Sequence, residues 1–332
     1  MQLPFVNDKN SGQRIKIFTW HIHGTYLYYL SLGSYEIYIP VSKEAKPGYV
    51  GRGTTFPFGE NVHEVDEDNV KNLELDCILF QTKKNFLEDQ YETLSAKQRE
   101  LPKVYLEHDP PQGSTPYTRH IITDKNVNLV HVTHFNSLLW DNNNLPFTVI
   151  EHGVEVREVP YSGELERGIV VINNIERRGR RLGLDLFLEV QKHVPIDLVG
   201  MGAERLGLGE VLHPELPKFL SRYRFFFNPI RFTSLGLAVC EAMTMGIPVV
   251  GLSTTELASV IKNGKTGIIH TDLNYLVAAM KDLLANREKA AQIGAAGKEM
   301  ALQRFDIKRF TADWLRVFKA AISRNQPSKI TL

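Results

Sequence analysis

The segment at residues 228–251 constrains the fold of this chain more than any other stretch. It reads as the end of a buried strand, a loop of small residues, a helix that opens at 234–236 and stops at Gly246, and a new strand from Pro248. Strands joined in this way run parallel, so the helix begins at the carboxyl edge of the sheet, where its free N–H groups and its dipole suit a phosphate. Glu241, one to two turns into the helix, is placed to accept hydrogen bonds from ribose hydroxyls. The segment therefore predicts a nucleotide-diphosphate site.

The first half of the chain shows the same alternation of strands and helices. Apolar runs of strand length end in polar or Gly/Pro-bearing loops at residues 15–20, 35–39, 76–81, 103–107, 129–133 and 148–151. These runs are rich in β-branched or aromatic residues, as buried parallel strands are. A helix is expected between two of them, at residues 85–98.

The second half repeats the alternation more regularly. Strands are expected at residues 168–172, 196–199, 225–228, 248–251 and 267–270, with helices between them. Ser253 and Glu256 predict a capping box for a helix that ends at Ile261, and Asp272 predicts the N-cap of the next helix. The last helices, at 287–303 and 307–323, follow the final strand, so the terminal helix is expected to cross back onto the first domain.

The length of the chain indicates two domains. The 332 residues are too many for one ordinary core and suit two domains of about 150 residues each. A stretch rich in Glu, Arg, Pro and Gly at 155–167 marks the boundary. We therefore predict two Rossmann-like, doubly wound α/β domains at 1–155 and 156–305, followed by a helix at 306–332 that returns to the first domain.

Composition excludes several classes of protein. The formal charge of +1, with 43% hydrophobic and 23% charged residues, provides no global field for nucleic acid or a membrane, so any anion site is local. Cys77 and Cys240 each lie in an apolar segment, which argues against a disulfide framework or a thiolate metal site and fits a reducing cytoplasm. No apolar run approaches about 18 residues, and the N-terminus is polar. A cytoplasmic protein is expected; peripheral attachment to the inner face of a membrane and the oligomeric state stay open.

Several motifs occur together in one known family. Leu-Gly-Leu-Ala-Val-Cys-Glu-Ala-Met-Thr-Met-Gly-Ile-Pro-Val-Val at 235–250 is followed by Gly-Lys-Thr-Gly at 264–267. This pattern resembles the C-terminal domain of family 4 glycosyltransferases of the GT-B fold, and segments 149–154, 199–202 and 225–229 also resemble that family. The resemblance implies two domains facing a cleft and transfer of a sugar, with retention of configuration, from a UDP- or GDP-linked donor to a saccharide, lipid-linked or small-molecule hydroxyl. It also implies that no metal or other cofactor takes part.

The resemblance also assigns roles around the donor. Glu241 stands at the second glutamate of the family's Glu-x7-Glu motif, which implies a contact with the donor ribose. Thr233 stands at the first glutamate, which in the family contacts the transferred sugar, so the identity of that sugar stays open. The amides of Ser234, Gly236 and Leu237 would bind the diphosphate.

An arginine-rich loop follows the expected strand at 168–172. Four of the five residues 177–181 are arginines, and a loop at the carboxyl edge of the sheet would place them beside the diphosphate. Guanidinium groups bind phosphate oxygens through a planar fork and would hold the charge that grows on the leaving nucleotide. We expect Arg180 or Arg181 to be this cation, without resolving which. The Lys-Gly step of the family reads Leu182-Gly183 here.

Two loops of the first domain offer further candidates. His108 follows the expected strand at 103–107, and the resemblance implies polar positioning or charge stabilisation near the anomeric carbon, although a structural role is equally open. Asp109 is a weaker candidate, because Asp-Pro also begins turns. Gly24, after the first strand, would approach the donor phosphate or the acceptor. His21 and His23 lack a third metal ligand at suitable spacing.

Three alternatives compete with this interpretation. Asp66 and Asp68 form the Asp-x-Asp of metal-dependent GT-A enzymes, but acidic residues before an expected helix at 69–73 suit a helix start better. A non-catalytic sugar-nucleotide-binding or partner subunit is motivated by Thr233 and by the altered Lys-Gly step. A nicotinamide-dependent oxidoreductase is disfavoured, because no strand leads into Gly-x-Gly-x-x-Gly with an acidic residue about 20 positions on.

Overall fold

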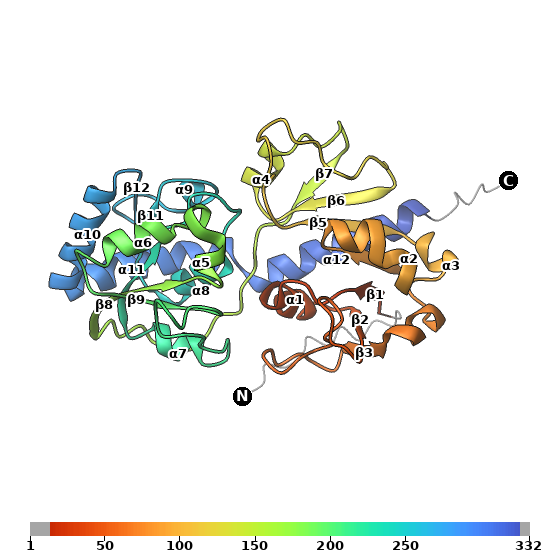
Figure 1. The fold of residues 1–332 in the computed structure, drawn as a ribbon, viewed down its shortest axis with the longest axis horizontal. Helices are drawn as coiled ribbons and strands as arrows, with labels where there is room; N and C mark the ends of the chain where they lie inside the picture. Colours follow the sequence, from red (N-terminus) through yellow and green to blue (C-terminus); the bar gives the residue numbers. More distant parts are fainter. Residues whose placement is uncertain (1–13, 326–332) are drawn as a thin grey trace.

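Two parallel β-sheets, one in each half of the chain, form the framework of the protein in the computed structural model, which describes residues 14–325 (Figure 1). The polar N-terminal stretch 1–13 and residues 326–332 lie outside the described part. The two predicted α/β domains are therefore confirmed in their architecture. No helix within 14–325 is long and apolar enough to cross a bilayer.

The first sheet has seven strands in the order β3-β2-β1-β4-β5-β6-β7. Their bounds are β1 Lys16–Thr19, β2 Glu36–Val41, β3 Val62–Asp66, β4 Cys77–Phe80, β5 Lys103–Glu107, β6 Val127–His131 and β7 Phe147–Val149. All pair in parallel, and Ile17 of β1 lies between Ile37 of β2 and Cys77 of β4. The strand order reverses between β1 and β4, and in open α/β sheets such a switch point is where ligands bind.

Two details of this domain differ from the sequence prediction. The edge strand β3 was not expected, because three of its five residues are polar and only Val62 is buried, and it is defined by pairing with β2. The expected helix at 69–73 is the 3₁₀ helix η1 (Glu67–Asn72), and Asp66 caps it by accepting a hydrogen bond from the Asp68 amide, which confirms the helix-start interpretation of the acidic pair.

The helices of the first domain are short. They are α1 (Gly24–Ser31), the π-helical turn η2 (Asn85–Asp89), α2 (Gln90–Thr93), α3 (Ala96–Arg99) and α4 (His134–Leu139). The single helix expected at 85–98 is wrong, because Leu94 is extended and Ser95 opens a new helix with a capping box to Gln98.

The second sheet has five parallel strands in the order β12-β11-β10-β8-β9. These are β8 (Leu165–Val171), β9 (Ile196–Val199), β10 (Tyr223–Asn228), β11 (Val249–Leu252) and β12 (Ile268–His270), which confirms the five expected strands. The helical segments are α5 (Ile175–Arg178), η3 (Gly179–Leu182), α6 (Leu184–Val190), α7 (Leu216–Leu220), α8 (Leu237–Met245), α9 (Leu257–Val260), α10 (Leu273–Ala285) and α11 (Arg287–Arg304).

Two of the three helix ends predicted from the sequence of this domain are confirmed. Gly246 ends α8 in the left-handed conformation, and Asp272 caps α10 by accepting from the Asn274 amide, both as predicted. The capping box at Ser253 and Glu256 is wrong. The Glu256 carboxylate instead accepts from the Phe135 amide of the first domain and pairs with Arg304, so a tertiary contact takes the place of the local one.

The last helix, α12 (Ile307–Asn325), returns to the first domain as predicted, where it packs on α1 and on β4, β5 and β6 (Figure 1). Phe310, Trp314 and Phe318 bury its inner face, and the Trp314 indole N–H donates to the Tyr26 hydroxyl at 3.1 Å. The helix therefore ties the end of the chain to the sheet with which the chain begins.

Candidate functional site

A cavity of about 420 Å³ lies between the two domains, next to the carboxyl ends of the central strands of both sheets. A volume in this range suits a small organic ligand. Its walls come from both halves of the chain: Gly24, Thr25, Thr55 and Phe56 from the first, and Asn173, Arg178, Gly200, Thr233, Gly236, Leu237 and Glu241 among others from the second. Five predicted site residues therefore meet here: Gly24, Thr233, Gly236, Leu237 and Glu241.

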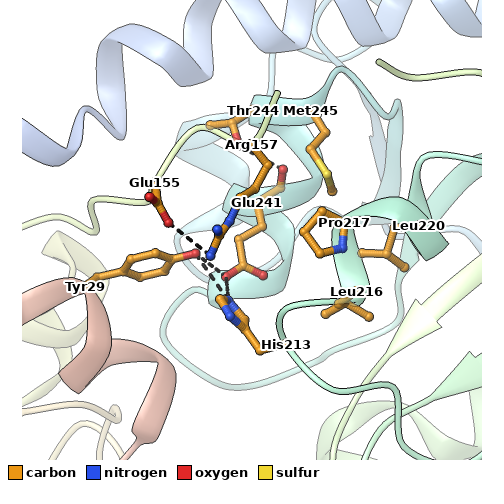
Figure 2. A pocket seen from close by; sticks show the side chains of 10 residues that line it. All are labelled: Tyr29, Glu155, Arg157, His213, Leu216, Pro217, Leu220, Glu241, Thr244 and Met245. Carbon is orange, nitrogen blue, oxygen red and sulfur yellow. Dashed lines mark hydrogen bonds and ion pairs between the residues drawn. The ribbon is translucent and has the colours of Figure 1, made fainter. Parts of the chain in front are cut away.

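Glu241 lies at the junction of this cavity and a smaller pocket that is drawn in Figure 2. Its Oε1 accepts hydrogen bonds from the Tyr29 hydroxyl at 2.6 Å and from His213 Nε2 at 3.1 Å. Tyr29 belongs to α1, so the first of these bonds joins the two domains. Burial, and then the nearby Glu241 carboxylate, raise the pKa of Tyr29 well above its usual value, so the phenol stays protonated and donates.

The second carboxylate oxygen of Glu241, Oε2, accepts no hydrogen bond from the residues at 14–325. Figure 2 shows the Tyr29 and His213 side chains pointing toward the carboxylate. Two neighbours thus orient Glu241 through one oxygen, and the other oxygen retains its capacity to accept hydrogen bonds from a ligand hydroxyl.

The N-terminus of α8 faces the same cavity. The helix begins at Leu237, slightly later than the sequence predicts, and Gly236 is its N-cap without a side chain to satisfy the first amides. No atom beyond its chain neighbours lies within 4 Å of the position that a Cβ of Gly236 would occupy, so the approach to these amides is open. Ser234 is buried and does not line the cavity. The carbonyl oxygen of the neighbouring Leu235 makes a hydrogen bond of 2.8 Å with His152 Nε2.

Among the arginines of the loop after β8, Arg178 lines the cavity. Burial, and then the charge of Arg181, lower its pKa, while Asp109 across the cleft acts in the opposite direction. Arg180 is largely exposed and pairs with Asp185 at 2.6 Å, and Arg181 donates to Gln112 of the first domain. The predicted cations Arg180 and Arg181 therefore have protein partners at the rim, and their role toward a ligand stays a prediction.

His108 is held in one neutral form by a chain of hydrogen bonds. The amide nitrogen of Gln81 donates to Thr19 Oγ1 and to the Trp20 carbonyl, which leaves Gln81 Oε1 to accept from His108 Nε2 at 3.1 Å. Nε2 thus carries the proton, and Nδ1 is the acceptor. Burial, and then His23 and His152, lower the pKa of His108 well below 6.5, so the imidazole is uncharged at neutral pH.

Next to His108, the chain enters α1 through His23 and Gly24. His23 adopts the left-handed conformation with φ 51°, and its ring centroid lies 4.2 Å from that of His108. A Cβ on Gly24 would meet the ring of Phe56 at 2.5 Å, so a larger residue here would have to displace that ring from the wall of the cavity. Within 14–325, no group of three or more His, Cys, Asp or Glu residues could hold a metal ion.

Sequence reasoning missed Tyr29, His213, Gln81 and, within the loop it singled out, Arg178. Gln81 had a signal, because it follows β4 as His108 follows β5, and neighbouring parallel strands end at one edge. Tyr29 had none, because its bond to Glu241 spans 212 positions and depends on how the domains meet.

Part of the second domain is similar in sequence to known proteins. Residues 184–286 match the sequence model of a family described as Glycosyl transferases group 1. A GDP-mannose-dependent alpha-(1-6)-phosphatidylinositol monomannoside mannosyltransferase of Mycolicibacterium smegmatis is 28% identical over 156 residues, which cover 39% of this chain and 41% of the relative. The lipopolysaccharide core biosynthesis mannosyltransferase LpsB of Rhizobium meliloti is 28% identical over 134 residues, covering 39% and 38%. The matched region spans about two fifths of the length of each of these relatives.

Solved structures show the same architecture over more than nine tenths of the chain. Sucrose-phosphate synthase from Thermosynechococcus elongatus superposes with a TM-score of 0.69 at 14% identity, covering 94% of this chain and all of that one. HepE of Anabaena, solved in complex with UDP, superposes with a TM-score of 0.65 at 13% identity, covering 93% of this chain and all of HepE. The fold is GT-B, and the match to the Glycosyl transferases group 1 family covers residues 184–286 of the second domain.

Proposed function

We propose that this protein transfers a sugar from a nucleotide-diphosphate sugar to the hydroxyl of an acceptor in the cleft between its domains. The observation that carries the proposal is the convergence of Glu241, the open N-terminus of α8 and Arg178 on one cavity. These groups match, in order, the hydroxyls of a ribose and the two phosphates beside it. The names of the relatives and the UDP-bound neighbour support the same chemistry.

In this proposal the donor lies mainly on the second domain. The ribose hydroxyls donate to Glu241 Oε2, and the diphosphate accepts from the first amides of α8, beginning at Leu237. Arg178 holds the phosphate that carries the sugar, with Arg180 and Arg181 adding positive charge at the rim. Donors linked to UDP or GDP both fit this scheme.

The proposed reaction follows from these positions. The acceptor oxygen forms a bond to the anomeric carbon while the bond from that carbon to the distal phosphate oxygen breaks and its electron pair leaves with the diphosphate. The acceptor attacks on the face of the sugar from which the diphosphate leaves, so the configuration is retained. The acceptor proton passes to the departing diphosphate on that face. Arg178 and the α8 dipole stabilise the negative charge that grows on the leaving group, so this scheme needs no metal.

His108 and the domain closure serve the sugar end of the donor. The neutral imidazole presents Nδ1 as an acceptor for a sugar hydroxyl, because Gln81 binds Nε2–H. Domain closure would exclude water, which would otherwise hydrolyse the donor.

By analogy with the two mannosyltransferases, we propose a saccharide or lipid-linked acceptor, and hence a cytoplasmic protein that attaches peripherally to a membrane.

A panel of UDP- and GDP-linked sugars, with acceptors of these classes and mass spectrometry of the products, tests the proposal. We expect multiple-turnover transfer from one donor. Glu241→Ala and Arg178→Ala should each lower kcat/KM by about 100-fold, because each removes a charge-assisted contact, while the protein stays folded. Near-unchanged kinetics in both variants would contradict the site.

The double variant Arg180→Ala, Arg181→Ala shows whether the rim arginines bind the diphosphate together with Arg178.

Thr233 favours one second candidate, a non-catalytic sugar-nucleotide-binding or partner subunit, because a hydroxyl stands where the resemblance implies a carboxylate. Donor binding without transfer to any acceptor of the panel would support that candidate, and turnover would eliminate it.

A further inference from the structure

Asp109 places a carboxylate across the cleft from Thr233. Its Oδ1 lies 3.5 Å from Thr233 Oγ1, although the two residues are 124 positions apart and belong to different domains. The main chain of Asp109 is anchored on both sides, because its N–H donates to Glu107 Oε1 at 3.1 Å and its carbonyl accepts from the Trp140 indole at 2.9 Å. Pro110 follows and restricts the backbone of Asp109 to extended conformations. The position of this carboxylate is therefore set by the fold.

The carboxylate retains most of its hydrogen-bonding capacity. Among the residues at 14–325, Thr233 is its one hydrogen-bond partner, and that bond is long. An ionised carboxylate has about four acceptor positions on its two oxygens. Its charge also acts on Arg178, which lines the cavity, and on His23 beside the cleft.

The order of groups along the second domain indicates which part of a donor would reach Asp109. Glu241 lies within α8, Gly236 at its start, and Thr233 in the loop before it, and all three line the cavity. A nucleotide sugar is a linear sequence of ribose, two phosphates and sugar. With the ribose on Glu241 and the phosphates at the helix start, the sugar extends toward Thr233.

We propose that Asp109 accepts hydrogen bonds from hydroxyls of the transferred sugar, and so supplies from the first domain the carboxylate that the second domain lacks at Thr233. This inference rests on the proposed function. It assigns sugar selection to a contact between the domains, so that a sugar is held only when the cleft is closed around it.

The test exchanges the carboxylate between the two positions. In Asp109→Asn, which keeps the shape of the side chain, we expect kcat/KM for the nucleotide sugar to fall about 10- to 100-fold, because a hydrogen bond to a charged group is lost. The affinity for the free nucleoside diphosphate, measured by calorimetry with UDP and GDP, should stay within about twofold of the wild type. Asp68→Asn, an exposed carboxylate on η1, is the matched control.

Thr233→Glu alone should also lower activity, because two carboxylates would face each other, whereas the double variant Asp109→Asn, Thr233→Glu should recover at least part of the loss. Wild-type kinetics in Asp109→Asn would overturn the inference. An equal loss of affinity for the free nucleoside diphosphate would also overturn it, since the residue would then act on the fold of the cleft. Failure of the wild type to bind any nucleoside diphosphate would instead refute the proposed function, and this inference with it.

Discussion

At the scale of single residues, the chemistry of His108 is set by neighbours that contribute no catalytic group themselves. Thr19, Gln81 and His108 follow or end adjacent parallel strands, and their side chains form one chain of hydrogen bonds. The last bond fixes the tautomer of the imidazole, and burial keeps it uncharged. The position of His108 at a strand end could be predicted from the sequence, but its protonation state could not, because it depends on burial and on the orientation of the Gln81 amide.

Gln81→Ala tests this tautomer. The variant should lower kcat about 10-fold and leave the affinity for free nucleoside diphosphate unchanged, since Gln81 contacts His108 and not the phosphate or ribose positions. Steady-state kinetics and calorimetry separate the two quantities. The exposed Gln292→Ala serves as a control, and an unaltered kcat in Gln81→Ala would show that the hydrogen bond has no part in turnover.

Two other buried histidines predict how stability depends on pH. Burial lowers the pKa of His131 and of His152 from 6.5 to about 4. Between these values the unfolded chain binds more protons than the native protein, so the free energy of unfolding falls as the pH drops below 6.5, by ~1.4 kcal/mol per pH unit for each histidine.

Urea unfolding at pH 7.5, 6 and 5 measures this dependence. His131→Asn, which removes one of the two groups, should reduce the slope. Stability that is constant or rises as the pH falls from 7.5 to 5 would be inconsistent with two neutral buried histidines.

At the scale of elements, the turn from η3 into α6 shows how a glycine sets the distance between two loops. Gly183 has φ 84°, and a Cβ there would lie 2.2 Å from the carbonyl oxygen of Pro229, at the start of the loop that leads to α8. Gly179, in the same loop, has φ 54° with no atom within 4 Å of its Cβ position. The arginine loop and the loop before α8 therefore leave no room for a side chain at Gly183, whereas Gly179 faces open space.

Gly246 provides a matched control for Gly183, because its φ of 84° and ψ of 22° are nearly the same as the φ of 84° and ψ of 26° of Gly183, and a Cβ there would meet no atom closer than 3.6 Å. Gly246→Ala should therefore cost only the strain of the left-handed conformation, about 1 kcal/mol of unfolding free energy. Gly183→Ala should cost at least about 2 kcal/mol more and should weaken nucleoside diphosphate binding, because Arg178 and the α8 N-terminus would move apart. Chemical denaturation and calorimetry measure both. Equal costs in the two variants would contradict the close approach.

The elements predicted from the sequence and those that were missed differ in where their determinants lie. Local composition predicts buried strands such as β10 and the end of α8 at Gly246. The edge strand β3 lacks that composition and depends on its pairing with β2. Glu256 does not cap its own helix, because its carboxylate binds Phe135 and Arg304, which are far away in the chain. Local pattern thus predicts elements whose burial is uniform and fails where a tertiary partner decides.

At the scale of the whole molecule, polar contacts across the cleft join the two domains. Tyr29 binds Glu241, Asp109 faces Thr233, and His152 binds the Leu235 carbonyl in the loop before α8. Each contact touches the loop before α8 or the helix itself, so the position of the first domain is coupled to the proposed donor site.

Tyr29→Phe tests that coupling. Loss of the hydroxyl leaves Oε1 of Glu241 with His213 alone, so we expect the affinity for the nucleoside diphosphate to fall about 3- to 10-fold. Tyr28→Phe is the control, because the neighbouring Tyr28 hydroxyl donates to Glu155 and not to Glu241. If the two variants bind equally well, the contact between the domains does not orient Glu241.

In our proposal, the cavity between the domains holds the nucleoside diphosphate of a sugar donor. Calorimetric titration of the wild type and of Glu241→Gln with UDP and with GDP tests it most directly, because it requires neither the sugar nor the acceptor. We predict that one nucleotide binds the wild type with one site per chain and that Glu241→Gln weakens it by at least about 10-fold. Binding of neither nucleotide, or equal binding by the two proteins, would contradict the account.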